Sequence, residues 1–214
     1  MKIEIWSDYV CPFCYIGKKR LDAALEKFEH RAEVELELRS FELDPQADSS
    51  LKQSTHSMLA EKYGMTVEKA REMSTGIKQQ AAAVGLEFNF DNMLVINTFD
   101  AHRLAQFAEE RGKGVEVGEM LLNAYFTYNA DLASYDVLAD IAERAGLSRT
   151  EALAVLEGHQ YADRVQAQEQ EGSQLGIRGV PFFVFNRKYA VSGAQPTEVF
   201  LDTLNKVWQE SQAN

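Results

Sequence analysis

Cys11-Pro12-Phe13-Cys14 contains both cysteines of the 214-residue chain. An alternating run over residues 2–6 predicts a β-strand just before the pair, and the periodicity after the pair predicts a helix. Two residues between cysteines at the first turn of a helix place both sulfurs on one face, close enough to form a small disulfide. A cysteine pair with this spacing and context is typical of dithiol–disulfide redox chemistry.

The expected helix start also assigns a role to each cysteine. Pro12 is tolerated there because the first helical turn has no intrahelical partner for its missing N–H. Free backbone N–H groups and the positive end of the helix dipole favour a thiolate on Cys11. We therefore expect Cys11 to be the nucleophile and Cys14 to be the resolving thiol.

Two other interpretations of the pair fit the sequence less well. A zinc site needs four ligands, and the chain has neither a second cysteine pair nor closely spaced histidines. A purely structural disulfide across so short a loop would restrain the unfolded chain far less than a long-range bridge. The histidines are scattered along the chain: His30, His56, His102 and His159. We therefore expect no metal site.

The composition limits the classes of partner. Lys and Arg number 22 and Asp and Glu 33, so the formal net charge of -11 repels nucleic acid and anionic membrane surfaces. Hydrophobic residues make up 45% of the chain, enough for a substantial core, but no apolar run approaches the roughly 20 residues of a membrane span. The N-terminal residues turn polar too soon for a signal peptide. We expect a cytoplasmic enzyme, although a secreted form without its leader would look the same.

The order of predicted elements divides the chain into three segments. Residues 1–45 predict strand, helix, strand, which implies a parallel pair joined by a crossover. Residues 46–175 predict an almost continuous series of helices. Residues 176–214 predict strand, strand, helix, with residues 182–185 as the first arm of a hairpin. We expect an α/β fold whose two halves are separated by a large all-helical insertion.

Capping patterns mark helix starts within the helical segment. Ser148 with Glu151 has the spacing of a capping box, and Asn97 with Asp100 resembles one. Ser134 is a candidate start for the helix between them. Each pattern predicts where a helix of the insertion begins.

The cysteine motif and the order of elements resemble the DsbA family of thioredoxin-fold proteins. Gly179-Val180-Pro181 precedes the predicted hairpin, at the place of that family's cis-proline segment. Within the family the chain is most similar to the FrnE-type branch, which itself resembles 2-hydroxychromene-2-carboxylate isomerases and kappa-class glutathione transferases. The resemblance covers essentially the whole chain and implies a thioredoxin fold with an all-helical insertion.

The resemblance also implies roles for individual residues. Cys11 matches the attacking cysteine, Cys14 the resolving one, and Pro181 the cis-proline that faces them. The backbone of Val180 is then expected to hydrogen-bond an extended substrate segment, as it would an added strand. An ordinary trans proline at the start of a strand is the alternative interpretation of Pro181.

Two departures from the family pattern bear on the chemistry. Pro12 and Phe13 lie between the cysteines, where we expect them to contact substrate, but strongly oxidising relatives have Pro-His there. Phe13 cannot supply a cationic imidazole, so we expect a milder oxidant. The isomerase and transferase relatives generally have serine at the attacking position, whereas this chain keeps both cysteines. That difference favours disulfide exchange over glutathione conjugation.

Five further residues are candidates for the cleft, and each also has an ordinary structural interpretation. Asp8 and Tyr9 precede the cysteine pair, where a turn residue and a partly buried aromatic are also expected. His102 is consistent with either a cleft role or a helix-packing role. Gln195 precedes the last helix, and it either offers its amide to a substrate or glutathione or is a loop residue. Arg178 would attract an anionic substrate or is a solvated surface charge.

The leading expectation is a thiol–disulfide oxidoreductase or protein disulfide isomerase that requires no metal or organic cofactor. Its substrate is expected to be a protein or small molecule with a thiol or disulfide, and glutathione is a candidate co-substrate. A glutathione-dependent isomerase or transferase of small organic molecules is the rival enzyme class. A redox-inert binding protein is the third class. The sequence determines neither the direction of electron flow nor the oligomeric state.

Overall fold

The computed structural model describes residues 1–212, which form two compact units. Residues 1–43 and those from Arg164 onward form the sheet unit, and residues 44–163 form the helical unit. In sequence, the helical unit is therefore inserted between the two halves of the sheet unit. No helix within residues 1–212 is both long and apolar enough to cross a bilayer.

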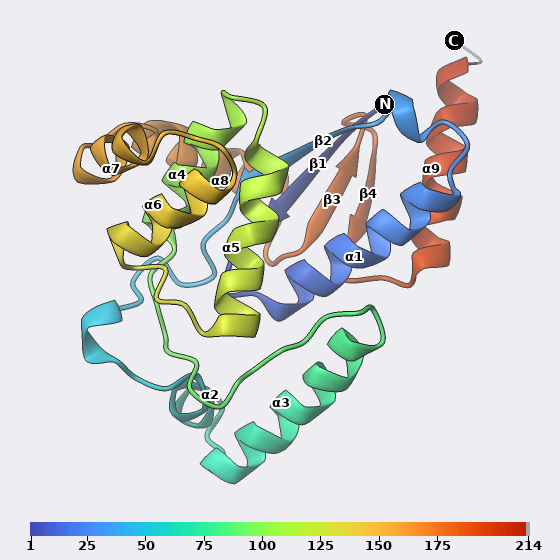
Figure 1. The fold of residues 1–214 in the computed structure, drawn as a ribbon. Coiled ribbons are helices and arrows are strands. Elements are labelled where there is room, and N and C mark those ends of the chain that lie inside the picture. The colour runs from blue at the N-terminus through green and yellow to red at the C-terminus, as the bar shows by residue number, and fades with distance from the viewer. Residues whose placement is uncertain (213–214) are drawn as a thin grey trace. The chain divides into compact units, whose positions relative to one another are not determined.

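The sheet unit has the strand and helix order that the sequence predicts. Its elements are β1 (Lys2–Ser7), α1 (Pro12–Lys27), a short 3-10 turn (Arg31–Glu33), β2 (Glu35–Ser40), α8 (Ala162–Gln174), β3 (Phe182–Phe185), β4 (Tyr189–Ser192) and α9 (Thr197–Gln212). The strands form one mixed sheet in the order β2-β1-β3-β4 (Figure 1). β1 and β2 are parallel, and the other neighbouring pairs are antiparallel. This is a thioredoxin fold, as the resemblance implies.

One face of the sheet is covered by hydrophobic side chains. Ile3 and Ile5 of β1 are fully buried, and Phe183 of β3 packs edge-on against Phe200 of α9 with the ring centroids 4.7 Å apart. α1 and α9 pack against each other. Because successive strand residues point to opposite faces, Glu4 and Trp6 lie on the other face of β1.

Helix α8 belongs to the sheet unit, although we expected it at the end of the insertion. The indole Nε1 of Trp6 donates to the Gln168 carbonyl over 3.1 Å, and the Ser40 N–H donates to Gln168 Oε1 over 2.8 Å. Gly172 lies against the Trp6 ring, where an added Cβ would be 2.8 Å from Nε1. These contacts tie α8 to β1 and β2. The unit boundary therefore falls between residues 163 and 164, rather than between 175 and 176.

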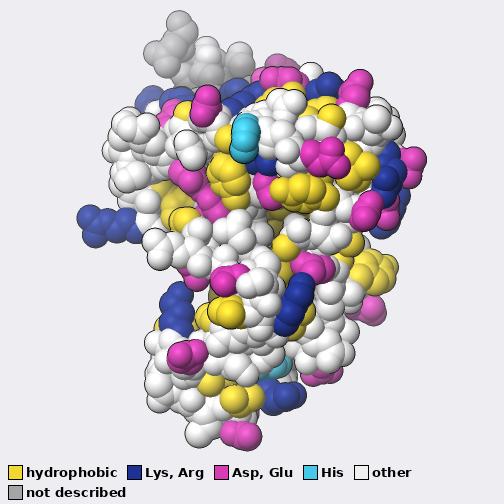
Figure 2. All heavy atoms as spheres, turned by 90° about the vertical axis from the view of Figure 1, so that its left-hand side faces the viewer, with side chains coloured by type: hydrophobic (Ala, Val, Ile, Leu, Met, Phe, Trp, Pro, Cys, Tyr) yellow, Lys and Arg dark blue, Asp and Glu magenta, His cyan; other side chains and the backbone are white. Residues whose placement is uncertain are grey.

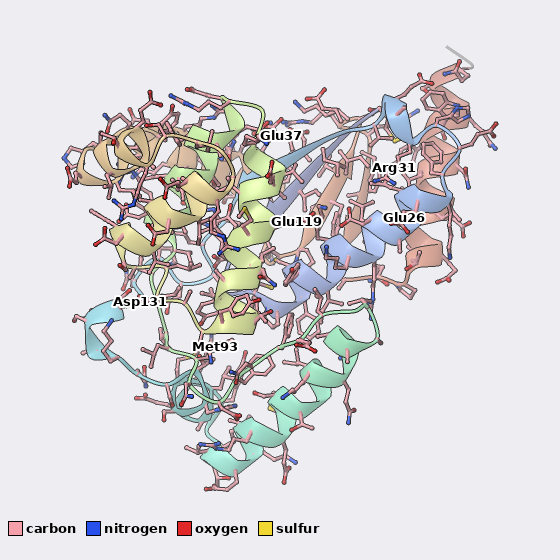
Figure 3. All side chains as sticks on the ribbon, in the orientation of Figure 1. Glu26, Arg31, Glu37, Met93, Glu119 and Asp131 are labelled. Atoms are coloured by element: carbon pink, nitrogen blue, oxygen red, sulfur yellow. The ribbon has the colours of Figure 1, made fainter. Side chains whose placement is uncertain are left out.

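A network of charged residues lies on the same face as Trp6. Glu4 is only 2% exposed and accepts hydrogen bonds from Arg39 and Arg187. Both guanidinium groups lie over the Trp6 ring, at 5.7 and 5.9 Å from its centroid. Glu37, which projects from β2 (Figure 3), and Glu171 of α8 complete the set. We call Glu4, Glu37, Arg39, Glu171 and Arg187 the Glu4 network.

The helical unit is built from six helices within residues 44–163. They are α2 (Thr55–Tyr63), α3 (Val67–Ala82), α4 (Phe99–Glu109), α5 (Gly114–Tyr128), α6 (Tyr135–Arg144) and α7 (Arg149–Glu157), after a short 3-10 turn at Ser49–Leu51. The capping box at α7 is confirmed, since Ser148 Oγ accepts from the Glu151 N–H over 3.3 Å. Ser134 occupies the N-cap of α6 without a side-chain capping bond.

The helical series is interrupted between α3 and α4. Residues 86–98 form an irregular segment instead of a helix. Several of their apolar side chains are buried, so tertiary packing rather than helical periodicity determines this segment. Phe88 stacks on Phe126 of α5 with the ring centroids 4.6 Å apart. Asn97 Oδ1 accepts from the Phe99 N–H rather than from Asp100, so the capping prediction was one residue out and Thr98 is the N-cap.

Charged side chains of both signs are interspersed over the molecular face that Figure 2 presents. Hydrophobic side chains lie in small clusters between them. The acidic excess of the chain is therefore mixed with cations on this face.

Candidate active site

The two cysteines lie at the N-terminus of α1, at the predicted helix start. Cys11 is the N-cap, with an extended backbone (φ -94°, ψ 109°), and Pro12 follows in the first turn. The Cys14 N–H donates to the Cys11 carbonyl over 3.1 Å, and the Cys11 N–H donates to the Asp8 carbonyl over 3.2 Å. Both thiols are free, and only 4% of Cys11 and 1% of Cys14 is exposed.

The segment around Pro181 meets Cys11. The Val180–Pro181 peptide bond is cis. Cys11 Sγ donates a hydrogen bond to the Val180 carbonyl oxygen over 3.5 Å. The Pro181 carbonyl accepts from the Gly193 N–H over 2.8 Å, which ties this segment to the turn after β4. Because β1 and β3 are antiparallel, the end of one strand and the start of the other bring these residues together.

The environment of Cys14 keeps its thiol protonated. Burial raises the pKa of Cys14 well above its ordinary value of 9.0. A hydrogen bond with Cys11 and the charge of a Cys11 thiolate raise this pKa further, while the Ser7 side chain and the Asp8 backbone lower it. Cys14 is therefore neutral at neutral pH in the reduced protein. The same hydrogen bond shows that the two sulfurs are close together.

We expect the two thiols to differ in alkylation. In the folded, reduced protein at neutral pH, iodoacetamide should modify Cys11 and leave Cys14 intact, since the thiolate is the reactive form and Cys14 holds its proton. Modification of Cys14 should begin only as the pH rises above the ordinary thiol range. Tandem mass spectrometry of the labelled peptide measures the difference, and urea-unfolded protein, in which both thiols react, is the control. Equal labelling in the folded state would contradict this assignment.

The raised pKa of Cys14 also makes stability depend on pH. The folded, reduced protein holds this proton more tightly than the unfolded chain does. The resulting stabilisation is complete below the ordinary thiol pKa and is lost as the pH rises toward the raised value.

Asp8 and Tyr9 lie beside the cysteine pair and are both buried. Asp8 Oδ2 accepts from the Leu43 N–H over 2.7 Å, and its carbonyl accepts from Cys11. Asp8 thus joins the turn before α1 to the segment after β2. Tyr9 is 3% exposed, so it lies in the interior next to the motif.

The remaining sequence candidates have different surroundings. Phe13 is 37% exposed between the two buried cysteines, so its ring is accessible to a substrate. Gln195 is exposed, and its Nε2 donates to the Ser192 carbonyl over 2.9 Å, which closes the turn before α9. His102 belongs to the helical unit, where it is buried within α4 and its N–H donates to the Thr98 carbonyl over 2.9 Å.

A shallow groove of about 300 Å³ runs along the Pro181 segment. Glycine backbone and small or apolar side chains form most of its lining. The lining residues are Gly176, Arg178, Gly179, Val180, Pro181, Phe182, Ser192 and Gly193. No described residue accepts a hydrogen bond from the Val180 N–H, which leaves this donor available to a ligand.

Two residues next to the site were not identified from the sequence. Ser7 ends β1, and its side chain hydrogen-bonds Cys14. Gly17 of α1 lies against the Pro181 segment, where an added Cβ would be 3.1 Å from Pro181 Cγ and 3.2 Å from Phe183 Cζ. A glycine inside a predicted helix was the available signal for Gly17, because glycine weakens a helix and often permits a close approach.

The contact of Gly17 leads to a stability prediction. In Gly17→Ala the free energy of unfolding should fall by about 1 kcal/mol, because overpacking against Pro181 outweighs the higher helix propensity of alanine. Gly76→Ala in α3 is the matched control, since nothing lies within 4 Å of its added Cβ. It should raise the free energy of unfolding by about 1 kcal/mol. Urea unfolding measures both, and equal stabilisation by the two changes would show that the contact is unimportant.

Within residues 1–212, no three His, Cys, Asp or Glu side chains are grouped as metal ligands. The chemical groups of the site are the two sulfurs, the N-terminus of α1 and the Pro181 segment.

Comparisons with known proteins agree with this fold. The DSBA-like thioredoxin domain family matches residues 2–205. The chain is 30% identical over 200 residues to the uncharacterized protein YwbO of Bacillus subtilis (strain 168), covering 92% of each protein.

Solved structures give the same result. The probable DsbA oxidoreductase SCO1869 from Streptomyces coelicolor is 43% identical, with a TM-score of 0.94, over 98% of this chain and 91% of that one. The cytosolic disulfide reductase DsbM from Pseudomonas aeruginosa, solved with GSH, is 17% identical, with a TM-score of 0.64, over 100% of this chain and 99% of that one. At that identity, the likeness to DsbM concerns the fold alone. From the family match over nearly its whole length, the chain belongs to the DSBA-like thioredoxin domain family.

Proposed function

We propose that this protein is a thiol–disulfide oxidoreductase or isomerase in which Cys11 attacks and Cys14 resolves. The observation that carries the proposal is the position of Cys11 Sγ, at the start of α1 and 3.5 Å from the Val180 carbonyl oxygen. Family membership and the name of SCO1869 support the same class of reaction. No metal or organic cofactor is needed, because two sulfurs are sufficient for the exchange.

The first step forms a mixed disulfide. The Cys11 thiolate, at the start of α1, attacks one sulfur of a substrate disulfide. An S–S bond forms between Cys11 and the substrate, and the substrate's other sulfur leaves as a thiolate that takes up a proton from solvent.

The second step is prepared by the first. Once Cys11 is in the mixed disulfide, it no longer carries the charge that raises the pKa of Cys14, whereas Ser7 and Asp8 still lower it. Cys14 then loses its proton more readily and attacks Cys11 Sγ. The Cys11–Cys14 disulfide forms, the substrate leaves as a dithiol, and two electrons have passed from protein to substrate.

The groove beside Pro181 is proposed to receive the substrate. The Val180 N–H is available to the backbone of an extended segment, and Phe13 offers an accessible ring beside the sulfurs. Pro12 and Phe13 stand where strong oxidants have Pro-His. We therefore propose that the reduction potential of this protein is lower, and hence less oxidising, than that of the strong oxidants. We propose a cytoplasmic setting and glutathione as a candidate co-substrate, as the family resemblance implies.

The reduction potential tests this proposal most directly. The protein is equilibrated in glutathione buffers of graded ratio, and its free thiols are counted by alkylation and mass. We expect reversible conversion between a dithiol and an internal disulfide at a potential below that of the strong oxidants, which is about -120 mV. Failure to cycle over the physiological range would favour a redox-inert binding protein. A potential as high as about -120 mV would overturn only the expectation about Phe13.

A glutathione-dependent isomerase or transferase is the second candidate, as the resemblance to the FrnE-type branch implies. It predicts that reduced glutathione raises the melting temperature and that a small electrophile is conjugated. The presence of both cysteines argues against it, because conjugation needs no resolving thiol. Conjugation that persists in Cys11→Ser would favour this second candidate.

A further inference from the structure

The groove beside Pro181 has one ionisable side chain among its eight described lining residues, that of Arg178. Arg178 is exposed, and no described residue forms an ion pair or a hydrogen bond with its guanidinium group. No carboxylate lines the groove within the described part of the chain. Among the described lining residues, Arg178 is therefore the one positive charge of a groove that reaches Cys11 through the Val180 carbonyl.

Three other arginines of the sheet unit are already engaged. Arg39 and Arg187 bind the buried carboxylate of Glu4, and Arg20 donates to the Ala194 carbonyl. Arg178 differs from these three because its five N–H donors remain available to a group that enters the groove. A guanidinium group binds a carboxylate through two parallel hydrogen bonds, which makes it selective for this partner.

We propose that Arg178 is a specificity-determining residue that favours polypeptide substrates with an aspartate or glutamate beside the reacting cysteine. This inference rests on the disulfide-exchange function proposed above. A polypeptide fits the groove because the Val180 N–H is available for a hydrogen bond to its backbone. The half-buried side chains of Val180 and Phe182 provide apolar contact on the same segment.

The net charge of the protein limits how this preference acts. At -11 the whole chain repels an acidic segment at long range. At about 0.15 M salt, charges more than roughly 8 Å apart are largely screened. The preference therefore operates on contact in the groove, after the substrate has arrived.

The test uses three peptides that differ only beside one cysteine of an internal disulfide, where they carry Glu, Gln or Lys. Pre-reduced protein is mixed with each oxidised peptide at about 0.15 M salt, so that one turnover transfers two electrons and no other reductant is needed. The second-order rate constant is followed by acid quenching and mass analysis. Wild type is compared with Arg178→Gln, Arg178→Glu and a matched control, Arg144→Gln. Arg144 is exposed, lies outside the groove, and its replacement removes the same charge.

For wild type and Arg144→Gln we expect the Glu peptide to react about threefold faster than the Gln peptide, with the Lys peptide slowest. In Arg178→Gln the three rates should converge, and in Arg178→Glu their order should reverse. Equal rates for the three peptides in wild type, or an unchanged order in Arg178→Glu, would overturn the inference.

Two further measurements separate this inference from the proposed function. If wild type does not reduce the uncharged reagent 2-hydroxyethyl disulfide, disulfide exchange itself fails, and the inference fails with it. If wild type reduces that reagent and Arg178→Gln slows only glutathione disulfide, the carboxylates recognised are those of glutathione. That result would overturn the polypeptide as occupant while leaving the proposed function intact.

Discussion

Cys11→Ser is expected to lose disulfide exchange almost completely. The rate constant for reduction of a disulfide peptide should fall by at least about 10³-fold, because a serine hydroxyl stays protonated at neutral pH and cannot replace the thiolate nucleophile. Single-turnover mixing of pre-reduced protein with peptide measures the loss. Circular dichroism and urea unfolding verify that the fold is kept, as the nearly isosteric change should allow.

Cys14→Ser is the matched variant, since it keeps the nucleophile and removes the resolving thiol. It should react with the peptide and then stop at the mixed disulfide, because no second sulfur can release Cys11. Non-reducing mass analysis should show one peptide bound to each protein. Wild-type turnover in Cys11→Ser, or adducts in Cys11→Ser but not in Cys14→Ser, would falsify the assignment of the two roles.

Glu4→Ala is expected to lower the free energy of unfolding by about 3 kcal/mol. Glu4 is 2% exposed and holds two guanidinium groups, so its removal leaves partly buried cations without their shared carboxylate. Urea denaturation of the reduced protein measures the change. The expected loss is large because the cost comes from the charges that remain rather than from the missing contact.

Glu35→Ala is the control for Glu4→Ala. Glu35 lies on the neighbouring strand β2, its side chain is 70% exposed, and it pairs with Lys2 at 3.5 Å. Loss of an exposed pair of this kind should change the free energy of unfolding by less than about 1 kcal/mol. A similar loss in both variants would show that burial of Glu4 does not determine the effect.

Much of the sheet unit was predictable because its signals are local. Alternation over residues 2–6 and 33–41 predicts strands, and the helical periodicity between them predicts the crossover that makes the strands parallel. The apolar run at residues 182–185 followed by a turn predicts the hairpin of β3 and β4. Ser148 with Glu151 predicts the start of α7.

The parts that the sequence did not predict depend on distant contacts. Glu4 is buried in an alternating strand, where Arg39 and Arg187 bind its carboxylate, and both partners are distant in sequence. The side-chain amide of Gln168 anchors α8 beside β2, and no pattern near Gln168 indicates a partner so far away in sequence. The close approach of Gly17 to Pro181 likewise needs both halves of the sheet in place.

The candidate site was predictable only in part. The sequence identifies Cys11 and Cys14 by their spacing, and the family resemblance identifies Pro181. The contribution of Ser7 to the Cys14 environment is a matter of three-dimensional proximity at the end of β1. Gln195 was a sequence candidate for substrate binding, but in the structure its amide hydrogen-bonds the Ser192 carbonyl within its own turn.

The insertion of the helical unit has a consequence for biosynthesis. Strand β1 lies between β2 and β3, and residues 44–163 must be translated before β3 leaves the ribosome. At about 5–20 residues per second this takes on the order of ten seconds. During that interval the nascent chain carries a dithiol without the Val180 carbonyl and a β1 edge without its neighbour. On a ribosome stalled within the insertion, the nascent chain therefore exposes the edge of β1, which is prone to aggregation. Its two thiols also lack the covering Pro181 segment.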